Sequence, residues 1–122
     1  MRLSNIINDK TILLDIKAKS KAEALREMVN YLKKNKLISR PEEVIDKLEQ
    51  RESLGTTALG EGLALPHCKV KWVNNPIVLV GLARQGVPFD APDGCPVNIF
   101  FLLITSLEDP SLNLQILALI AP

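Results

Sequence analysis

The spacing of apolar residues predicts a helix early in the chain. Ser20-Lys21-Ala22-Glu23 fits the capping box, in which the serine and glutamate side chains accept hydrogen bonds from each other's backbone N–H groups. The apolar positions recur every three or four residues, which gives about four turns of amphipathic helix: Ala22, Leu25, Met28, Val29 and Leu32. The polar positions form a face that we expect to lie in solvent: Lys21, Arg26, Glu27, Lys33 and Lys34.

A second helix is predicted from residue 40 onward. Arg40-Pro41-Glu42-Glu43 places a proline and two acids in the first turn, where both favour helix formation. We expect this helix to end near Arg51-Glu52, because Gly55 and the two threonines after it are poor helix residues. Its apolar face is short: Val44, Ile45 and Leu48. Residues 112–121 predict a third helix that starts near Asp109-Pro110-Ser111.

Apolar runs without helical spacing predict the strands. Thr11–Ile16 and Leu63–Leu65 are short strand candidates. Pro76–Ala83 and Val97–Ile104 are continuously apolar, which is typical of strands buried on both faces. Such strands need helices on both sides of their sheet. Between them, Gly86–Pro96 holds three prolines and two glycines and predicts a loop.

Composition limits the class of protein. A chain of 122 residues is long enough for one domain over residues 1–122. Apolar residues (47%) and charged residues (24%) exclude wholesale disorder, and a net charge of +1 gives no reason to expect a nucleic-acid or membrane surface. The longest apolar run, Ile99–Ile104, is too short to span a bilayer, and we expect no signal peptide. Cys68 and Cys95 are expected to be reduced, partly buried thiols of a cytoplasmic protein.

One stretch of the chain carries candidate chemistry. His67 is the only histidine, and the proline before it fixes the backbone φ angle. Arg51 stands sixteen residues earlier and can bind phosphoryl oxygens bidentately. The intervening loop, residues 53–62, holds three glycines and two residues with hydroxyl and amide donors: Thr56 and Thr57. A neutral imidazole is a nucleophile near physiological pH, so this order predicts a histidine that carries phosphate.

Other chemistries are less favoured. An isolated histidine is most often a structural residue, and only the context of His67 argues against that. No lysine-containing phosphate loop is present, which disfavours nucleotide binding. Cys68 as a nucleophile with His67 as its base is disfavoured, because neighbours in an extended chain point to opposite sides. His67, Cys68, Asp93 and Cys95 lack metal-ligand spacing, and Asp90 and Asp93 lie where aspartate usually forms turns.

The motif resembles a known family, the fructose/mannitol-type (type 2) enzyme IIA domains of the bacterial phosphoenolpyruvate:sugar phosphotransferase system, which include the nitrogen-regulatory enzyme IIA. The family pattern is an Arg-Glu pair, a small-residue loop and a Pro-His. This chain shows it at Arg51-Glu52, Gly55-Thr56-Thr57, Gly60, Gly62, Ala64 and Pro66-His67. Two further segments are similar to the family's first helix start and its loop into the last core strand: Ser20–Leu25 and Gly86–Val97.

The resemblance implies a fold and roles for residues. The fold is an α/β, three-layer α/β/α sandwich with a mixed central sheet. His67 would be phosphorylated through Nε2 and Arg51 would be its electrostatic partner, with no cofactor and no metal. The chain departs from the family in three places. Cys68 stands where glycine is usual, and Asn113 stands where many members have a second histidine. The C-terminal helical layer is expected to be shortened.

The implied function is phosphoryl relay. His67 would accept phosphate from the histidine-containing phosphocarrier protein and pass it to an enzyme IIB, while Arg51, Thr56, Thr57 and Asn113 contact the phosphoryl group. Two alternatives stay open, a regulatory protein whose phosphorylated histidine controls partner binding, and a non-catalytic binding module of the same fold. A shortened helical layer would leave sheet surface open, so we expect either self-association or marginal stability.

Overall fold

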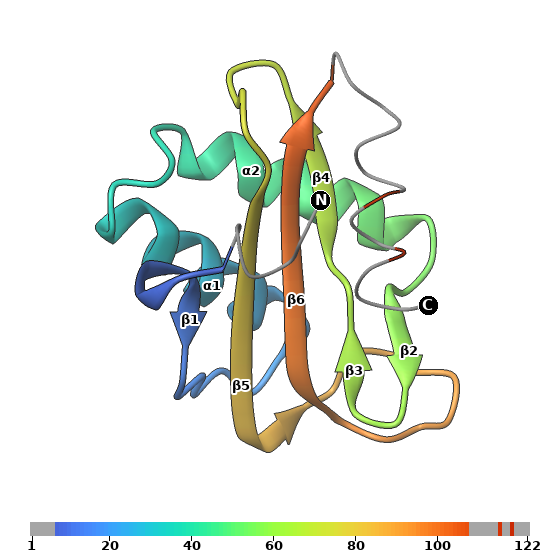
Figure 1. Cartoon of the computed structure of the whole chain (residues 1–122). Coiled ribbons are helices and arrows are strands. Elements are labelled where there is room, and N and C mark those ends of the chain that lie inside the picture. The colour runs from blue at the N-terminus through green and yellow to red at the C-terminus, as the bar shows by residue number, and fades with distance from the viewer. Residues whose placement is uncertain (1–6, 108–114, 116–117, 119–122) are drawn as a thin grey trace.

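The computed structural model describes residues 7–107, 115 and 118. Over residues 7–107, two helices and six strands follow a short 3-10 helix (Figure 1). In chain order the elements are η2 (Asp9–Thr11), β1 (Ile12–Leu13), α1 (Lys21–Lys34), α2 (Pro41–Ser53), β2 (Ala58–Gly60), β3 (Leu63–Ala64), β4 (His67–Val70), β5 (Ile77–Val87) and β6 (Val97–Ser106).

The sheet is mixed, as expected. Its strand order is β1-β5-β6-β3-β2, and β4 also pairs with β6. The long strands β5 and β6 are antiparallel, whereas β1 is parallel to β5, and β3 and β4 are both parallel to β6. Figure 1 shows β3 and β4 following one another along the same side of β6. The α/β class with a mixed central sheet is therefore confirmed.

Helix α1 begins as the sequence predicts, with one change in the cap. The Ser20 hydroxyl oxygen accepts a hydrogen bond from the Glu23 N–H at 3.2 Å. The Glu23 carboxylate accepts from the Lys19 N–H, also at 3.2 Å, and so caps one residue earlier than the capping box requires. The buried face begins at Ala24, because Ala22 is exposed. Helix α2 starts at Pro41 as expected and ends at Ser53, slightly beyond the predicted end.

Both helices pack on one face of the sheet and enclose the core. Figure 1 shows α1 and α2 behind β5 and β6. Burying one large apolar side chain contributes roughly 1.5–3 kcal/mol, so this layer is the main source of stability. Its buried members include Leu25, Met28 and Leu32 of α1, Val44, Ile45 and Leu48 of α2, Leu79 and Ala83 of β5, and Phe100, Leu102 and Ile104 of β6.

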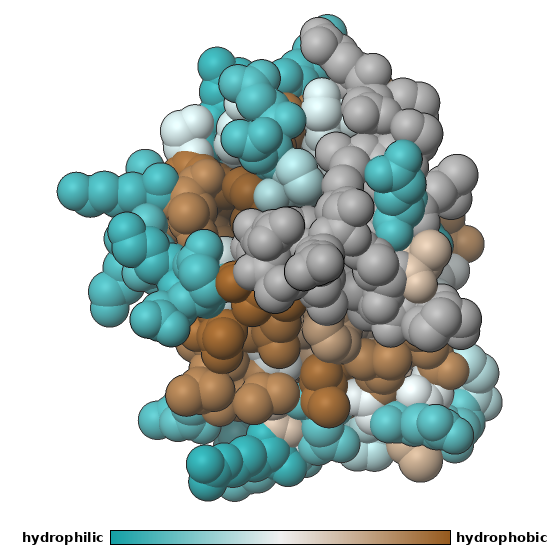
Figure 2. Space-filling view, viewed as in Figure 1, coloured by the Kyte–Doolittle hydropathy of each residue, from teal (hydrophilic) through white to brown (hydrophobic). Residues whose placement is uncertain are grey.

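The opposite face of the sheet presents apolar side chains, which Figure 2 shows in the same view as Figure 1. The helix expected there, residues 112–121, lies outside the described residues except for Gln115 and Ala118, both of which are helical. The predicted second helical layer, and its expected shortening, are thus tested only at those two positions. Large apolar side chains exposed in the described part of the chain are Leu14, Leu54, Leu59, Ile99 and Leu107.

The strands differ from the sequence prediction where pairing overrides local composition. The first strand is limited to Ile12–Leu13. Thr11 belongs to η2, and the ladder with β5 includes only Ile12 and Leu13. Residues 58–60, predicted as loop, form β2 because a turn with positive φ at Gly60, Glu61 and Gly62 returns the chain to pair with β3. Strand β5 continues to Val87, where it regains pairing with β6 after a register shift.

Two glycines with nearly equal φ angles give a test of the packing at the end of β5. Gly86 has φ +80°, and a β carbon placed there would lie 2.7 Å from Cβ of Pro96. Gly94 has φ +74° and nothing within 4 Å of such a carbon. Alanine at either position costs about 1 kcal/mol or more for the left-handed backbone, and the contact with the rigid proline ring adds about 1–3 kcal/mol at Gly86 only.

We therefore expect Gly86→Ala to lower the free energy of unfolding more than Gly94→Ala does, by the cost of that contact. Urea denaturation of both variants beside the unmodified protein measures the difference. Equal losses in the two variants would show that Pro96 moves aside freely.

Candidate functional site

His67 is the first residue of β4, and its side chain lies on the opposite face of that strand from the core residue Cys68. Its register partner on β6 is Leu103. Side chains alternate along β4, so that His67 and Lys69 are half-buried while Cys68 and Val70 are buried in the core. The prediction that His67 and Cys68 face opposite sides is confirmed. Strand geometry produces this result, because successive side chains of a strand lie on opposite faces of the sheet.

A hydrogen bond to the backbone sets the proton distribution of the imidazole. Nδ1 of His67 lies 2.8 Å from the carbonyl oxygen of Leu65, two residues earlier across Pro66. A carbonyl only accepts, so Nδ1 must carry the hydrogen. In the neutral ring Nε2 then keeps its lone pair. The lone pair is therefore left on Nε2, the nitrogen through which the sequence resemblance implies phosphorylation.

Arg51 reaches the same site from the last turn of α2. Its Nη1 donates to the carbonyl oxygen of Gly55 at 2.9 Å, which holds the guanidinium against the loop that follows the helix. Arg51 and His67 together line two neighbouring cavities. One, of about 400 Å³, is also lined by Lys47, Gln50, Leu54, Cys68 and Lys69. The other, of about 310 Å³, is also lined by Thr56, Thr57, Leu59, Leu65 and Ala118.

The structure thus brings four of the five predicted site residues together, but the threonine hydroxyls are engaged elsewhere. The Thr57 hydroxyl donates to the Glu52 carboxylate, and the Thr57 N–H donates to the other oxygen of that carboxylate at 3.1 Å. The Thr56 hydroxyl donates to the carbonyl oxygen of Phe89 at 2.5 Å. Either hydroxyl would have to leave its acceptor to contact a phosphoryl oxygen.

Glu52 belongs to a largely buried charge network that sequence reasoning missed. Its side chain is 6% exposed and lies 2.9 Å from the Lys21 ammonium, which is itself 23% exposed. The same ammonium lies 3.4 Å from Asp90 and 4.6 Å from the centre of the Phe89 ring. Lys21 was expected in solvent, and this expectation is wrong because its ammonium is paired with Glu52. The network ties the start of α1 to the end of α2 and to the threonine loop.

The fifth predicted residue, Asn113, lies outside the described residues, so its role stays a prediction. Gln115 and Ala118 are the described residues of the same predicted helix, and Ala118 lines the cavity with His67 and the threonines.

Thiol chemistry is disfavoured in this site. Burial raises the pKa of the Cys68 thiol to about 12, while the nearby Lys47 lowers it and Glu43 raises it by smaller amounts. The thiol is therefore protonated near neutral pH, and although Cys68 lines the cavity of about 400 Å³ it is buried against the core. Cys95 is exposed, so the expectation of partial burial is wrong for that residue.

Asp93 forms turns, as its place in the Pro/Gly loop predicts. Its carboxylate accepts from the Cys95 N–H at 3.1 Å and from the Glu61 N–H at 2.8 Å. These backbone hydrogen bonds hold the pKa of Asp93 below its usual value. Over the described ranges, no cluster of three histidine, cysteine or acidic side chains is arranged as a metal site, and no helix there has the length and apolar character needed to cross a membrane.

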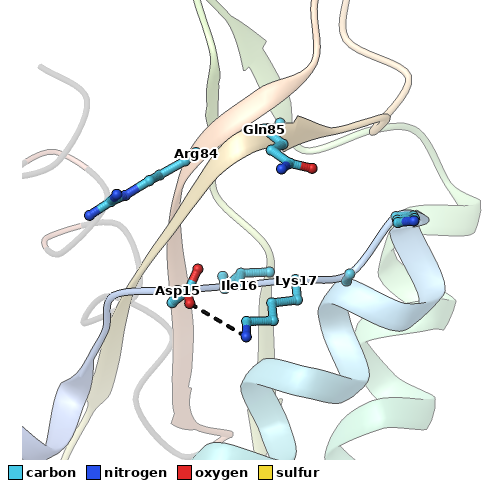
Figure 3. A pocket seen from close by; sticks show the side chains of 8 residues that line it. Asp15, Ile16, Lys17, Arg84 and Gln85 are labelled. Carbon is cyan, nitrogen blue, oxygen red and sulfur yellow. Dashed lines mark ion pairs between the residues drawn. The ribbon is translucent and has the colours of Figure 1, made fainter.

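A separate cavity lies between the segment before α1 and the end of β5 (Figure 3). Lys17 and Asp15 form an ion pair at 3.8 Å there, and Arg84 extends away from that pair. Neither a histidine nor a cysteine lines this cavity. The candidate functional site is therefore the pair of cavities around His67.

The family follows from comparison with known sequences. Residues 5–122 match the family described as "Phosphoenolpyruvate-dependent sugar phosphotransferase system, EIIA 2". The chain belongs to this family. As an EIIA 2 domain it is part of a system that transfers phosphoryl groups, and the resemblance carried by the Arg51–His67 motif is confirmed.

Two curated relatives carry different descriptions. The chain is 30% identical over 118 residues to the PTS system fructose-specific EIIABC component of Bacillus subtilis, matching 97% of this chain but only 19% of that protein. It is 31% identical over 121 residues to the nitrogen regulatory protein of Pseudomonas aeruginosa, matching 99% of this chain and 79% of that protein.

Solved structures share the fold. The crystal structure of the nitrogen regulatory protein IIA-Ntr from Neisseria meningitidis has a TM-score of 0.86 and 32% identity, covering 95% of this chain and 79% of that one. A complex of enzyme IIA mannitol and phosphorylated enzyme IIB mannitol from Escherichia coli has a TM-score of 0.71 and 23% identity, covering 92% and 78%. At that identity the second similarity is one of fold alone.

The bond from Nδ1 to Leu65 predicts the tautomer of the only histidine. At a pH where the ring is neutral, we expect the Nδ1–H form to dominate in the folded protein, because Leu65 stabilises that form alone. Nitrogen-15 NMR of the labelled imidazole gives one unambiguous pair of signals, and the chain unfolded in urea provides the reference. A folded protein with the hydrogen mainly on Nε2 would contradict the bond and the nucleophile that it leaves.

Proposed function

We propose that residues 1–122 act as one phosphoryl-carrier domain, in which His67 accepts phosphate from the histidine-containing phosphocarrier protein and passes it to an enzyme IIB. The observation that carries the proposal is the Nδ1 bond to Leu65, which leaves Nε2 of His67 with its lone pair in a cavity shared with Arg51. Membership of the EIIA 2 family supports the reaction class.

The transfer exchanges one N–P bond for another. Nε2 of His67 attacks the phosphorus of the donor's phosphohistidine, the donor's N–P bond breaks, and its imidazole leaves with the electron pair. Such transfers pass in line through a loose, metaphosphate-like state, so the protein contributes mainly position and electrostatics. The Arg51 guanidinium is placed to bind the equatorial oxygens. The proposal includes no cofactor and no metal, because the donor is already an activated phosphoramidate.

The choice of acceptor rests on the relatives. The Bacillus subtilis relative is an EIIABC component, and the Escherichia coli enzyme IIA mannitol has been solved with phosphorylated enzyme IIB mannitol. A cytoplasmic location is part of the same proposal. Self-association is a further part of the proposal. It is supported by Leu59 and Ile99, which are exposed apolar residues that line the same cavity. Sedimentation at several protein concentrations tests it.

A regulatory role is the second candidate function. Two nitrogen regulatory proteins, from Pseudomonas aeruginosa and Neisseria meningitidis, match nearly all of this chain. Phosphorylation of His67 would add roughly two negative charges to the open cavity, enough to change the affinity of a partner bound there. Transfer of labelled phosphate onward to an enzyme IIB distinguishes relay from regulation, because a purely regulatory protein keeps the label.

Replacement of His67 tests the central assignment. We expect His67→Ala to accept no phosphate from the phosphorylated carrier protein, because the chain has no second histidine. Intact-protein mass spectrometry at neutral or basic pH should show a single added phosphate on the unmodified chain and none on the variant. His67→Asn is the matched control, because an asparagine amide can still donate toward Leu65 and preserve the local turn. Undiminished labelling of either variant would remove His67 from the reaction.

The geometry of Arg51 gives a second test. Arg51→Lys keeps the charge but loses the planar fork that binds two oxygens and the bond to Gly55. We expect transfer from the carrier protein to slow by about tenfold to a thousandfold, measured by rapid quench. Arg84→Lys, at an exposed position in the separate cavity, should transfer at the normal rate. Normal transfer by Arg51→Lys would assign Arg51 a structural role only.

A further inference from the structure

Three cationic side chains from two elements line the cavity of about 400 Å³ at His67. Lys47 and Arg51 stand four residues apart on α2, which places them on the same helix face. Lys69 stands two residues after His67 on β4, which places it on the same face of the sheet. All three line the cavity of about 400 Å³ with His67. This grouping appears in a chain whose net charge is only +1.

The two lysines are not neutralised by carboxylates in the part of the chain that the structure describes. The ion pairs there involve Lys17, Lys21 and Arg26, and neither Lys47 nor Lys69 takes part. Glu43 is the acidic group near Cys68, and its carboxylate accepts a hydrogen bond from the Trp72 indole N–H. Both lysines are half-buried, so their charges are screened less than those of fully exposed lysines.

The cavity of about 310 Å³, which Thr56 and Thr57 line, offers a different chemistry. Its two hydroxyls already donate to Phe89 and Glu52, and among the described residues that line it Arg51 is the one lysine or arginine. A phosphoryl group on nitrogen carries nearly two negative charges near neutral pH, so it is stabilised most where unpaired cations converge. Within the described residues that condition is met in the cavity of about 400 Å³, which Lys47, Arg51 and Lys69 line.

We propose that Lys47 and Lys69, together with Arg51, form an anion subsite that holds the phosphoryl group carried by His67. The inference rests on the proposed function, because it names what binds the transferred group. As the bond between Nε2 and phosphorus forms and the donor's bond to phosphorus breaks, the phosphoryl oxygens settle against the lysine ammonium groups. The subsite stabilises both the group in transfer and the phosphohistidine that results.

Acidic side chains of a partner protein are the competing ligand, and the choice of phosphoryl donor separates the two. Phosphoramidate is a small donor with no protein surface, and its transfer to Nε2 breaks its own N–P bond and releases ammonia. The phosphorylated carrier protein supplies both the phosphoryl group and a docking surface. The test compares the unmodified chain with Lys47→Met and Lys69→Met under both donors, and Lys33→Met, at an exposed position on α1, is the matched control.

We expect each lysine variant to accept phosphate about tenfold more slowly from both donors, as for loss of one charged group from a phosphoryl-transfer site. Lys33→Met should match the unmodified chain, and Lys69→Arg should recover most of the rate. Phosphorus-31 NMR gives a readout that altered folding would not imitate. The pKa of the phosphoryl group on His67 should rise when a neighbouring cation is removed.

Two results overturn the inference. Normal rates from phosphoramidate with slow rates from the carrier would assign the lysines to partner docking, and normal rates from both donors would leave them without a role at this site. The proposed function is tested separately by the unmodified chain. If phosphoramidate labels His67 but the carrier does not, the relay proposal fails while the subsite is still judged from the phosphoramidate rates.

Discussion

Pairing along one side of β6 positions the candidate site. The Gly62 carbonyl accepts from the Asn98 and Ile99 N–H groups, and the Pro66 carbonyl accepts from the Leu103 N–H at 2.9 Å. Strands β3 and β4 therefore pair with β6 one after the other, and Pro66, which lies between them, is also hydrogen-bonded to β6. Since a proline has no N–H to donate, only its carbonyl takes part in this pairing. The constraint delivers His67 at one register position with its ring folded back toward Leu65.

The end of α2 separates the two residues of the Arg-Glu pair. Arg51 turns outward to the Gly55 carbonyl and the cavities around His67, whereas Glu52 turns inward to Lys21 and Thr57. A buried carboxylate is tolerated only when it is paired and hydrogen-bonded, and Glu52 has both kinds of partner. Glu52 thus holds the loop at Thr57, and Arg51 donates to the same loop at Gly55. Adjacent residues therefore serve the structure and the proposed chemistry.

The charge distribution around His67 is uneven. On one side of the imidazole the polar groups are engaged by the protein itself, and on the other side three cations converge with no carboxylate paired to the lysines among the described residues. An open cavity lined by three cations fits the relay that we propose, in which the phosphoryl group arrives from one protein and leaves with another. Such a group needs electrostatic stabilisation without enclosure, because both partners must reach it.

Local sequence signals were sufficient for the helices and for the linear motif. Ser20 and Pro41 predict where α1 and α2 begin, because capping and proline geometry act within a few residues. The order of Arg51, the threonine loop and Pro66-His67 is likewise readable along the chain, and so is the family that it resembles. These features depend on near neighbours, and near neighbours are what a sequence displays directly.

Long-range contacts had to be seen in the folded chain. Residues 58–60 form a strand only because a turn pairs them with β3, and Lys21 is half-buried only because the end of α2 brings Glu52 to it. The convergence of Lys47 and Lys69 on His67 joins a helix to a strand, with no spacing rule that connects them. The pair of Lys21 with Glu52 and the grouping of Lys47 with Lys69 join residues far apart along the chain, and the packing of α2 against α1 and against β4 brings them within reach.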